Sequence, residues 1–469
     1  MLLLGTGRAV ITPPLDTPSG IWMAQSHIRA AGLHLDLWVS AMLLQDGESG
    51  ERVALLDFDL THFSDPQAAA VRREVAAATG IPEDHVVLCC THNHAAPVQQ
   101  DSYAGEGEDR VRLFIASIPG LAAGAAVEAA RNLREVRVAG GTGRSDIGLN
   151  RDLPLPSGRI VTGPNPDGFA DREVRVVRFD TTDGRPYACI VNYQCHPTIL
   201  GPENQLMSPD YPGVVRRVVE ARTGAFCVYL QGAAGNMGPA ETFVGAAEVC
   251  DRLGTLLGLE AAKVFIGIST EAAHDELVGV VESGAPLARY RRVPDAAPPC
   301  GLALRSRKAA LPVRHPLPEL YEQVEQRTAQ RHAELAALER QGAPEREIVR
   351  ARQRLTREGL RAQRASMYRA VDHLEVEMHA LRLGQVALLL MWGEPYSQIG
   401  AEVKRLSPFS DTVFAGYTGG DPIYIPTPDA YTDRPAFEVE NSPFAPEAAE
   451  VAVRSALSLL RELADNETG

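Results

Sequence analysis

The fold is indicated by a short apolar run that ends in polar residues, Val86-Val87-Leu88-Cys89-Cys90-Thr91-His92-Asn93-His94. An uninterrupted apolar run of this length is typical of a strand that is buried on both faces. In layered α/β folds the carboxyl ends of neighbouring strands gather around one crevice. The two histidines that follow this run are therefore candidates for a functional site at the edge of a sheet.

Three further polar motifs are predicted to reach the same crevice. They are Cys195-His196-Pro197-Thr198, Gly393-Glu394-Pro395 and Asp421-Pro422-Ile423-Tyr424, and the first two directly follow the apolar runs at 189–193 and 386–392. Zinc binds imidazole nitrogen and carboxylate oxygen, and a catalytic zinc site needs only a few protein ligands and an open position for water. The four motifs together predict one zinc site.

Strand-like and helix-like patterns alternate along the chain. Three pairs show this alternation: Val53–Phe58 then Pro66–Thr79, Val86–Cys90 then Arg110–Asn132, and Phe226–Leu230 then Gly245–Lys263. The alternation predicts an α/β fold with helices packed on β-sheets. Asp210 is expected to cap a helix over Val214–Arg222, and the segment 269–311 is expected to be less regular.

A charged segment at 315–369 interrupts the alternation. Apolar residues recur in it at helical spacing among many Glu, Gln and Arg, and Gln341-Gly342-Ala343-Pro344 supplies a helix stop and a restart. We therefore expect a helical hairpin inserted at 315–370 within a single domain over 1–469. An exposed helix pair is the simpler interpretation, and a dimerisation arm or a lid over the site is the alternative.

The composition excludes several classes of protein. The chain has 469 residues, of which 45% are hydrophobic and 23% are charged, and this is enough for a large core. The formal net charge of -14 disfavours nucleic acid and anionic membranes as partners, because both are polyanionic. A small-molecule substrate is the expected partner, membrane insertion is not expected, and a homo-oligomer is left open.

The sequence also predicts a cytoplasmic location. Residues 1–8 lack the basic start and the long apolar stretch of a signal peptide, and no later run is expected to be long enough to span a bilayer. The seven cysteines favour reduced thiols over a disulfide framework. Four of them lie in apolar runs and are expected in the core: Cys89, Cys90, Cys189 and Cys227.

The histidine motifs each have a structural alternative. On a strand, the i, i+2 spacing of His92 and His94 would point both rings to one face, so that one ring binds metal while the other orients a substrate. Ordinary hydrogen bonding at a strand end is the alternative for this pair, and a structural turn is the alternative for His196 before Pro197. Glu394 follows the most apolar run in the chain, where a carboxylate needs a cation or hydrogen bonds.

Nine short motifs occur in a fixed order along the chain. They are Ile11-Thr12-Pro13, Leu56-Asp57-Phe58-Asp59, Thr91-His92-Asn93-His94, Asn150-Arg151, Asn192-Tyr193-Gln194-Cys195-His196-Pro197-Thr198, Ser208-Pro209-Asp210-Tyr211-Pro212-Gly213, Gln231-Gly232-Ala233-Ala234-Gly235-Asn236, Gly393-Glu394-Pro395 and Tyr424-Ile425-Pro426-Thr427-Pro428. As an ordered set, from about Ile11 to Leu460, they resemble the neutral/alkaline non-lysosomal ceramidases.

This resemblance implies a zinc-dependent hydrolase of N-acyl amide bonds whose catalytic domain packs β-sheets between helices. By motif, the family's zinc ligands fall on His92, His196, Glu394 and Tyr424. The second histidine of its HxH motif falls on His94, and the arginine of its Asn-Arg motif falls on Arg151. Further candidates for the surroundings of the metal or the substrate pocket are Asp59, Asn93, Asn150 and Asn236.

The sequence departs from the family pattern in several places. Gly235-Asn236-Met237-Gly238-Pro239 stands where the family has Gly-Asp-Val-Ser-Pro, so an acidic group and a serine hydroxyl are missing. Phe437 stands where the family has a second tyrosine, and the chain ends at Gly469 without the family's C-terminal β-sandwich domain. These differences predict a soluble substrate of modest size rather than long-chain ceramide.

The predicted reaction is attack of zinc-bound hydroxide on an amide carbonyl, because zinc brings the pKa of bound water toward about 7. Tyr424 and Arg151 are expected to stabilise the oxyanion, and His94 to carry a proton to the leaving amine. Asp59 is expected either to orient a ligand or only to end its strand. Two alternatives remain: a zinc hydrolase of an ester, lactone or cyclic amide, and a non-catalytic ligand-binding or scaffold protein.

Overall fold

A single large sheet forms the centre of the molecule. The computed structural model describes residues 1–22, 24–101, 103, 105–295, 301–314, 317–368, 370–421, 423–433 and 435–465. The sheet has 12 strands: β1 (Leu2–Val10), β3 (Trp38–Asp46), β4 (Arg52–Phe58), β5 (Val86–Cys90), β6 (Arg134–Arg144), β9 (Glu173–Thr181), β10 (Pro186–Tyr193), β12 (Phe226–Gln231), β16 (Leu302–Pro312), β17 (His373–Leu383), β18 (Val386–Trp392) and β20 (Asp411–Thr418).

The order of these strands is β12-β10-β9-β6-β1-β3-β4-β5-β20-β18-β17-β16. The pairs β4/β5, β10/β12 and β18/β20 are parallel, and the other neighbours are antiparallel. The sheet curls so that its inner face packs on itself, because one core cluster joins Leu55 of β4, Ile190 of β10 and Leu388 of β18. Each of these side chains is fully buried.

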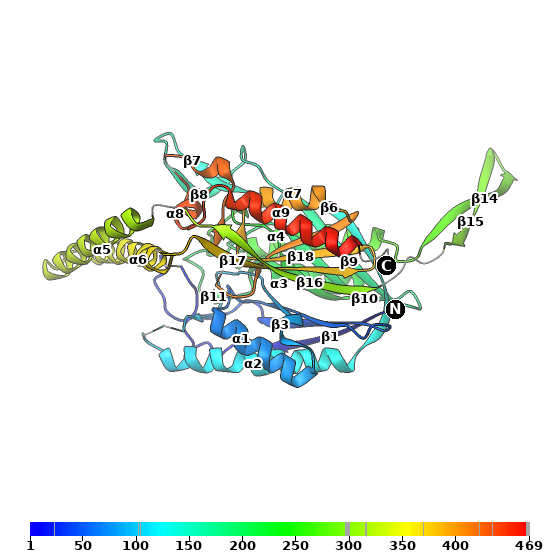
Figure 1. Cartoon of the computed structure of the whole chain (residues 1–469), viewed down its shortest axis with the longest axis horizontal. Coiled ribbons are helices and arrows are strands. Elements are labelled where there is room, and N and C mark those ends of the chain that lie inside the picture. Colours follow the sequence, from blue (N-terminus) through cyan, green and yellow to red (C-terminus); the bar gives the residue numbers. More distant parts are fainter. Residues whose placement is uncertain are drawn as a thin grey trace.

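Three pairs of helices cover the outer faces of the curled sheet. They are α1 (Asp65–Thr79) with α2 (Glu108–Arg131), α3 (Asp210–Thr223) with α4 (Ala247–Gly267), and α7 (Ser397–Leu406) with α9 (Ala448–Asp465). In Figure 1, α1 and α2 lie below the strands, and α7 and α9 lie above them. Each pair closes its own core cluster against the strands. The predicted α/β fold with sheets between helices is confirmed.

Smaller sheets decorate this body. They are β2 (Gly32–Leu33) with β11 (Leu206–Met207), β7 (Gly148–Pro154) with β8 (Ile160–Asn165) and β13 (Met237–Pro239), β14 (Ala273–Glu282) with β15 (Pro286–Pro294), and β19 (Glu394–Pro395) with β21 (Tyr424–Ile425). The segment 269–311 is therefore more regular than its sequence suggests. Both strands β14 and β15 are exposed, so they lack the apolar alternation by which half-buried strands are found.

The helix ends follow from local chemistry. Ser64 and Gln67 form a capping box at the start of α1, and Gly80 ends the helix in the left-handed conformation. The expected capping role of Asp210 is wrong, since Pro209 holds the cap position and Asp210 is the first residue of α3. The Asp210 carboxylate instead accepts the backbone N–H of Leu200, which ties the preceding loop to the helix start.

Helix α2 corrects a second expectation. By length and composition alone it is long and apolar enough to cross a membrane, whereas the sequence was expected to contain no such run. Phe114, Ile118 and Ala122 of α2 are buried in the cluster that faces β1 and β3. A core helix of a soluble protein can pass the same test, and α2 packs one side on the sheet with 39% of its apolar window buried.

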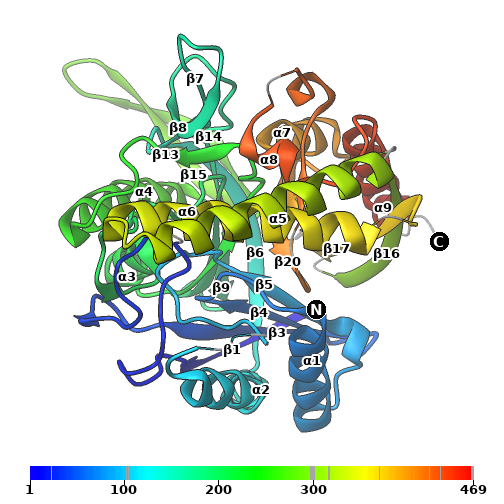
Figure 2. The ribbon, with the colours of Figure 1, turned by 90° about the vertical axis from the view of Figure 1, so that its left-hand side faces the viewer.

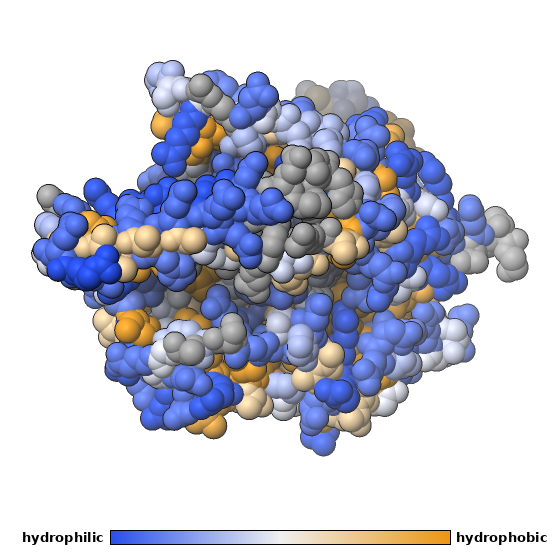
Figure 3. Space-filling model, turned by 60° about the vertical axis from the view of Figure 1, so that its left-hand side comes forward, coloured by the Kyte–Doolittle hydropathy of each residue, from blue (hydrophilic) through white to orange (hydrophobic). Residues whose placement is uncertain are grey.

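The charged segment forms two helices, α5 (Leu317–Arg340) and α6 (Glu345–Tyr368). Ion pairs join them, between Arg327 and Glu358 at 3.2 Å and between Arg352 and Glu339 at 2.8 Å. The pair projects from the end of the molecule that carries β7, β8 and the short helix α8 (Phe437–Glu440), and crosses in front of that end (Figures 1 and 2). This side of the molecule is mostly hydrophilic (Figure 3). The predicted hairpin bounds at His315, Pro316 and Arg369 lie outside the described residues.

Candidate metal centre

The ring of His92 is oriented by a backbone carbonyl. Strand β5 ends at Cys90, and His92 has a left-handed φ of 63°, so the expectation that His92 and His94 continue a strand is wrong. His92 Nδ1 lies 2.7 Å from the carbonyl oxygen of Thr61. A carbonyl oxygen can only accept, so Nδ1 carries the proton and Nε2 presents a lone pair.

His196 is held in the same way from the other side of the crevice. It follows β10, is completely buried, and its Nδ1 lies 3.1 Å from the carbonyl oxygen of Ala234 in the loop after β12. The lone pair is therefore again on Nε2. Two strand ends thus deliver two imidazole nitrogens in the protonation state that a metal requires.

Glu394 lies where both lone pairs point. Its Oε2 is 3.5 Å from His92 Nε2 and 3.7 Å from His196 Nε2. Ligand bonds of 2.0–2.1 Å around a tetrahedral zinc place neighbouring ligand atoms about 3.3 Å apart. Both distances from the Glu394 oxygen are close to this spacing, so the three atoms can share one zinc ion.

His94 also faces this centre. The candidate ligand atoms of His92, His94 and His196 all lie within 4.8 Å of one another. Among the described residues, the buried Nε2 of His94 has no hydrogen-bond partner. The ring of His94 lies against Trp22, with centroids 4.9 Å apart. The geometry allows His94 either as a further ligand or as a proton carrier beside the metal.

Burial keeps all three rings neutral. Burial and the nearby Arg151 cation together lower the pKa of His92 to about 3, against the opposing effect of the hydrogen bond to Thr61. Burial also lowers the pKa values of His94 and His196 well below their usual range. Neutral imidazole is the form that coordinates metal, so the site is prepared for a cation at neutral pH.

Tyr424 is brought beside Glu394 by the short sheet β19–β21, in which the two residues are paired. Its hydroxyl accepts a hydrogen bond of 3.2 Å from Arg151 Nη2. The same nitrogen of Arg151 forms an ion pair of 2.7 Å with Glu438 on α8, and both charged side chains are buried. Glu438 therefore fixes the guanidinium that faces the Tyr424 phenol.

Two functional neighbours are absent from the sequence prediction. Glu438 lies on a four-residue helix without periodicity, so no pattern marks it. Tyr417 ends the apolar run of β20, where an aromatic residue is expected in the core, yet its ring centroid lies 4.4 Å from that of His92. Its hydroxyl is 3.4 Å from His196 Nδ1, and its φ of 57° is left-handed, which marks a functional constraint.

The four remaining predicted residues support the loops around the centre. Asp59 pairs with Arg216 and accepts the backbone N–H of Trp38 at 2.9 Å. The Asn93 amide donates to the Asp59 carbonyl at 2.8 Å.

Asn150 accepts the backbone N–H of Asp152 at 2.9 Å. Asn236 accepts the backbone N–H of Ser397 at 2.8 Å, where α7 begins. These side chains hold strand ends in place, and the hydrogen bonds that the structure records for them run to the scaffold.

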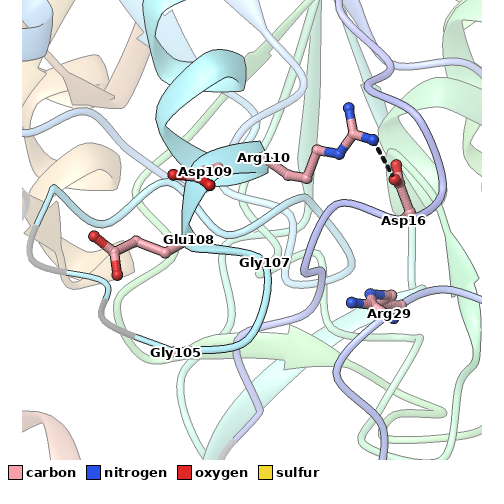
Figure 4. Close-up of a pocket in the computed structure, with 7 residues that line it drawn as sticks. All are labelled: Asp16, Arg29, Gly105, Gly107, Glu108, Asp109 and Arg110. Carbon is pink, nitrogen blue, oxygen red and sulfur yellow. Dashed lines mark ion pairs between the residues drawn. The ribbon is translucent and has the colours of Figure 1, made fainter.

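A separate cavity of about 460 Å³ lies at the start of α2, between Asp16, Arg29 and Arg110 (Figure 4). Its cations are already paired, Arg110 with Asp16 at 2.9 Å and Arg29 with Glu106 at 2.8 Å. None of the residues that line this cavity belongs to the histidine cluster.

Comparisons with known proteins agree with the resemblance seen in the motifs. The neutral ceramidase of Pseudomonas aeruginosa is 25% identical over 248 residues, which cover 50% of this chain and 36% of that protein. Neutral ceramidase A of Dictyostelium discoideum is 23% identical over 227 residues, which cover 45% of this chain and 30% of that protein. The matched stretch spans about a third of the length of these relatives. No protein-family model matches the chain.

Two solved structures share the fold. The structure described as "Ceramidase complexed with C2" superposes with a TM-score of 0.68 at 17% identity, covering 99% of this chain and 75% of that chain. The crystal structure of neutral ceramidase from Pseudomonas aeruginosa gives a TM-score of 0.67 at 18% identity, with the same coverage. At this identity the likeness concerns the fold.

Proposed function

The chain is a member of the neutral ceramidase family, and from that premise we propose that it hydrolyses the amide bond of an N-acyl compound at a zinc centre. The observation that carries this proposal is the convergence of two imidazole Nε2 atoms on one carboxylate oxygen, at 3.5 and 3.7 Å. Both imidazoles are oriented by backbone carbonyls, as metal-binding histidines usually are.

We assign His92, His196 and Glu394 as the protein ligands of the metal, with the Tyr424 phenol beside them. Imidazole and carboxylate donors in a tetrahedral arrangement suit zinc. When bound, zinc polarises a carbonyl oxygen and lowers the pKa of a coordinated water molecule toward about 7. A catalytic site of this kind needs no serine, in agreement with Gly238 in the place of the family's serine.

Arg151 and Tyr424 supply positive charge and a directed hydroxyl next to the ligands. The pKa of the Tyr424 phenol is raised by burial and by the charge of Glu394, so the phenol stays protonated and can donate. Arg151 is fixed by Glu438 and orients the phenol oxygen. Two donors held in a buried site stabilise negative charge that develops on a substrate carbonyl oxygen.

His94 is proposed to move the proton. It is neutral and half-buried, its buried Nε2 has no partner among the described residues, and it lies within reach of the other two rings. A neutral imidazole in this place can accept a proton on the attacking side and return it to the leaving nitrogen.

The surroundings of the centre favour a polar substrate. Asp152, Glu438 and Tyr396 adjoin Arg151, and Asn236 bonds Gln398 close by. Carboxylates, a phenol and an amide on this side of the centre are poorly suited to contact with a long alkyl chain. We therefore propose a soluble N-acyl compound of modest size as the substrate, rather than long-chain ceramide.

A panel of N-acyl amines with acyl chains of increasing length, each with its matched ester, tests this function. We expect amide hydrolysis that needs zinc, that is best with short or polar acyl groups, and that is abolished in His196→Ala. Hydrolysis of long-chain ceramide at a higher kcat/KM than any shorter amide would contradict the substrate proposal. A faster rate on every ester than on its matched amide would contradict the bond assignment.

We also propose a reducing compartment such as the cytoplasm. Six cysteines are described, and all six are free and buried: Cys89, Cys90, Cys189, Cys195, Cys227 and Cys250. Cys189 and Cys227 are paired across β10 and β12 and are still not bonded to each other. Free thiols in such proximity are typical of proteins kept reduced.

A further inference from the structure

A pocket of about 250 Å³ lies between helices α1 and α2, which Figure 1 shows below the strands. Most of its lining is apolar, and includes Val71 of α1, Phe114 and Ile118 of α2, and Phe63 of the loop before α1. An apolar cavity of roughly 150 Å³ is already large enough to hold benzene. The pocket therefore has room for a small organic molecule with an apolar body.

One polar side chain in this lining is left without a partner. Gln99 is only 7% exposed, and among the described residues neither its Nε2 nor its Oε1 makes a hydrogen bond. Its backbone carbonyl accepts a hydrogen bond of 2.8 Å from Gln67 Nε2, which holds the residue beside α1. A buried amide without partners is unfavourable, because its bonds with water are not replaced. Gln99 thus offers both donor and acceptor groups to a ligand in the pocket.

Helix α2 supplies a further acceptor. Pro119 lies inside this helix and has no N–H, so the carbonyl oxygen of Ile115, one turn earlier, lacks its usual helical donor. Both residues line the pocket. A ligand with more than one N–H can therefore find acceptors on the α2 side as well as at Gln99.

The polar groups of the pocket favour a neutral ligand. Asp101 also lines the pocket, and its carboxylate already accepts hydrogen bonds from Gln67 Nε2 and from the Ser64 hydroxyl. A carboxylate ligand would be repelled by this charge, and it can only accept, so Gln99 Oε1 would stay without a donor. A primary amide carries a donor and an acceptor side by side. It can pair with the amide of Gln99 through two reciprocal N–H···O bonds.

We propose that this pocket is a binding site for a small neutral molecule that carries a primary amide on an apolar body. The amide pairs with the side chain of Gln99, and the apolar body packs between α1 and α2. None of the residues that line the pocket belongs to the histidine cluster, so the site is separate from the candidate metal centre. This inference does not depend on the proposed activity.

Calorimetric titration of the full-length chain with benzamide tests the site. We expect saturable binding of one benzamide per chain, with a Kd of roughly 1 mM or tighter for so small a ligand. Acetophenone keeps the ring and the carbonyl but has no N–H, and benzoate is charged and lacks a donor. Both should therefore bind at least tenfold more weakly than benzamide.

Two variants identify the pocket. Gln99→Met removes the donor and the acceptor, so it should weaken benzamide binding tenfold or more. It should also raise the Tm of the ligand-free protein, because an unpartnered buried amide is lost. Ala70→Leu should weaken binding tenfold or more by filling the pocket from α1, where Ala70 is part of the lining. Ala69→Leu is the matched control, since Ala69 is exposed on the same helix outside the lining.

The titration must also separate this pocket from the metal centre, because benzamide is itself an amide. His196→Ala should bind benzamide as tightly as the wild type does. Circular dichroism checks the fold of each variant, and if either Gln99→Met or Ala70→Leu does not fold, the other decides the test.

Three results would overturn the proposal. The first is that the wild type shows no saturable binding of benzamide. The second is that a folded Gln99→Met or Ala70→Leu variant binds benzamide with wild-type affinity. The third is that His196→Ala loses the binding, which would place the amide at the metal centre.

Discussion

Each of the two proposed ligand histidines faces the candidate metal position because a backbone carbonyl holds its other nitrogen. For His196 that carbonyl belongs to Ala234, at 3.1 Å. The ring is completely buried, so no solvent can compete for this bond. The metal site is therefore set by main-chain geometry at the strand ends as much as by the identity of the ligands.

Replacement of His196 by alanine should remove the metal and spare the fold. We expect about one zinc per chain in the wild type. Most of it should be lost in His196→Ala, because only two of the three proposed protein ligands, His92 and Glu394, would remain. Elemental analysis with circular dichroism measures both properties. His274→Ala, a change at an exposed histidine on β14, should retain its zinc. Equal zinc content in the two variants would exclude His196 from the site.

His94 should affect turnover rather than metal content. His94→Ala is expected to keep its zinc and to lower kcat by roughly 10²–10⁴-fold, as is typical when a general acid or base is lost. Zinc analysis and steady-state kinetics of one preparation decide the matter. Loss of zinc would make His94 a ligand, in line with its position within 4.8 Å of the other donors. Full activity would place the proton path elsewhere.

Asp152 should make the stability of the protein depend on pH. Burial and the charge of Glu438 raise its pKa to about 7, against the opposing charge of Arg151. A carboxyl group with a raised pKa in the folded state stabilises the fold fully below its unfolded pKa of about 3.8. This stabilisation is lost as the pH rises through about 7.

Urea unfolding between pH 4 and pH 8 tests this. The Asp152→Asn variant keeps an uncharged group at all pH values, so its stability should fall less than that of the wild type over this window. The difference should amount to a few kcal/mol at most. Asp167→Asn, a change at an exposed site on a nearby loop, should follow the wild type. The predicted direction would be wrong if the wild type gained stability relative to Asp152→Asn as the pH rises from 5 to 8.

At the scale of elements, the loop after β12 packs directly on β19. A Cβ added to Gly235 would lie 2.6 Å from the carbonyl oxygen of Glu394 and 2.9 Å from that of Pro395. Backbone atoms cannot yield as a flexible side chain can. The glycine thus allows the strand that carries Glu394 to approach the loop whose Ala234 carbonyl holds His196.

Gly235→Ala should therefore damage stability and metal binding together. We expect a loss of about 1–3 kcal/mol in the free energy of unfolding, the usual cost of overpacking, with weaker zinc binding. Gly120→Ala is the control, and it should raise the free energy of unfolding. Its added Cβ meets nothing within 4 Å on helix α2, where alanine is preferred to glycine. Wild-type zinc affinity in Gly235→Ala would show that β19 can shift freely.

The strands that build the site could be predicted because both their faces are buried. The runs at β5 and β18 are continuous and apolar, and the polar residues that follow them mark the sheet edge. Strands β14 and β15 have no buried face, so their sequence lacks the alternation of apolar and polar residues that would reveal a strand. Tyr417 was missed because an aromatic residue in an apolar strand is typical of a core. Its strained φ appears only in three dimensions.

At the scale of the whole molecule, the curled sheet explains how ligands so distant in sequence meet. Strand β12 contacts both β4 and β20 across the inner core, although β12 lies at the edge of the sheet and far from both in the strand order. A flat sheet of the same strand order would separate the ends of β10 and β18 by seven intervening strands. Sequence patterns establish the strands, whereas the curl depends on how the whole inner face packs.

The order of the ligands along the chain has a consequence for biosynthesis. His92 and His196 are synthesised well before Glu394 and Tyr424, which come after strand β18. A growing polypeptide that has not yet passed β18 therefore cannot complete the candidate metal site, because the carboxylate is still missing. We expect metal insertion only after β19 and β21 have been made, and a nascent chain that stalls before β18 should not retain the ion.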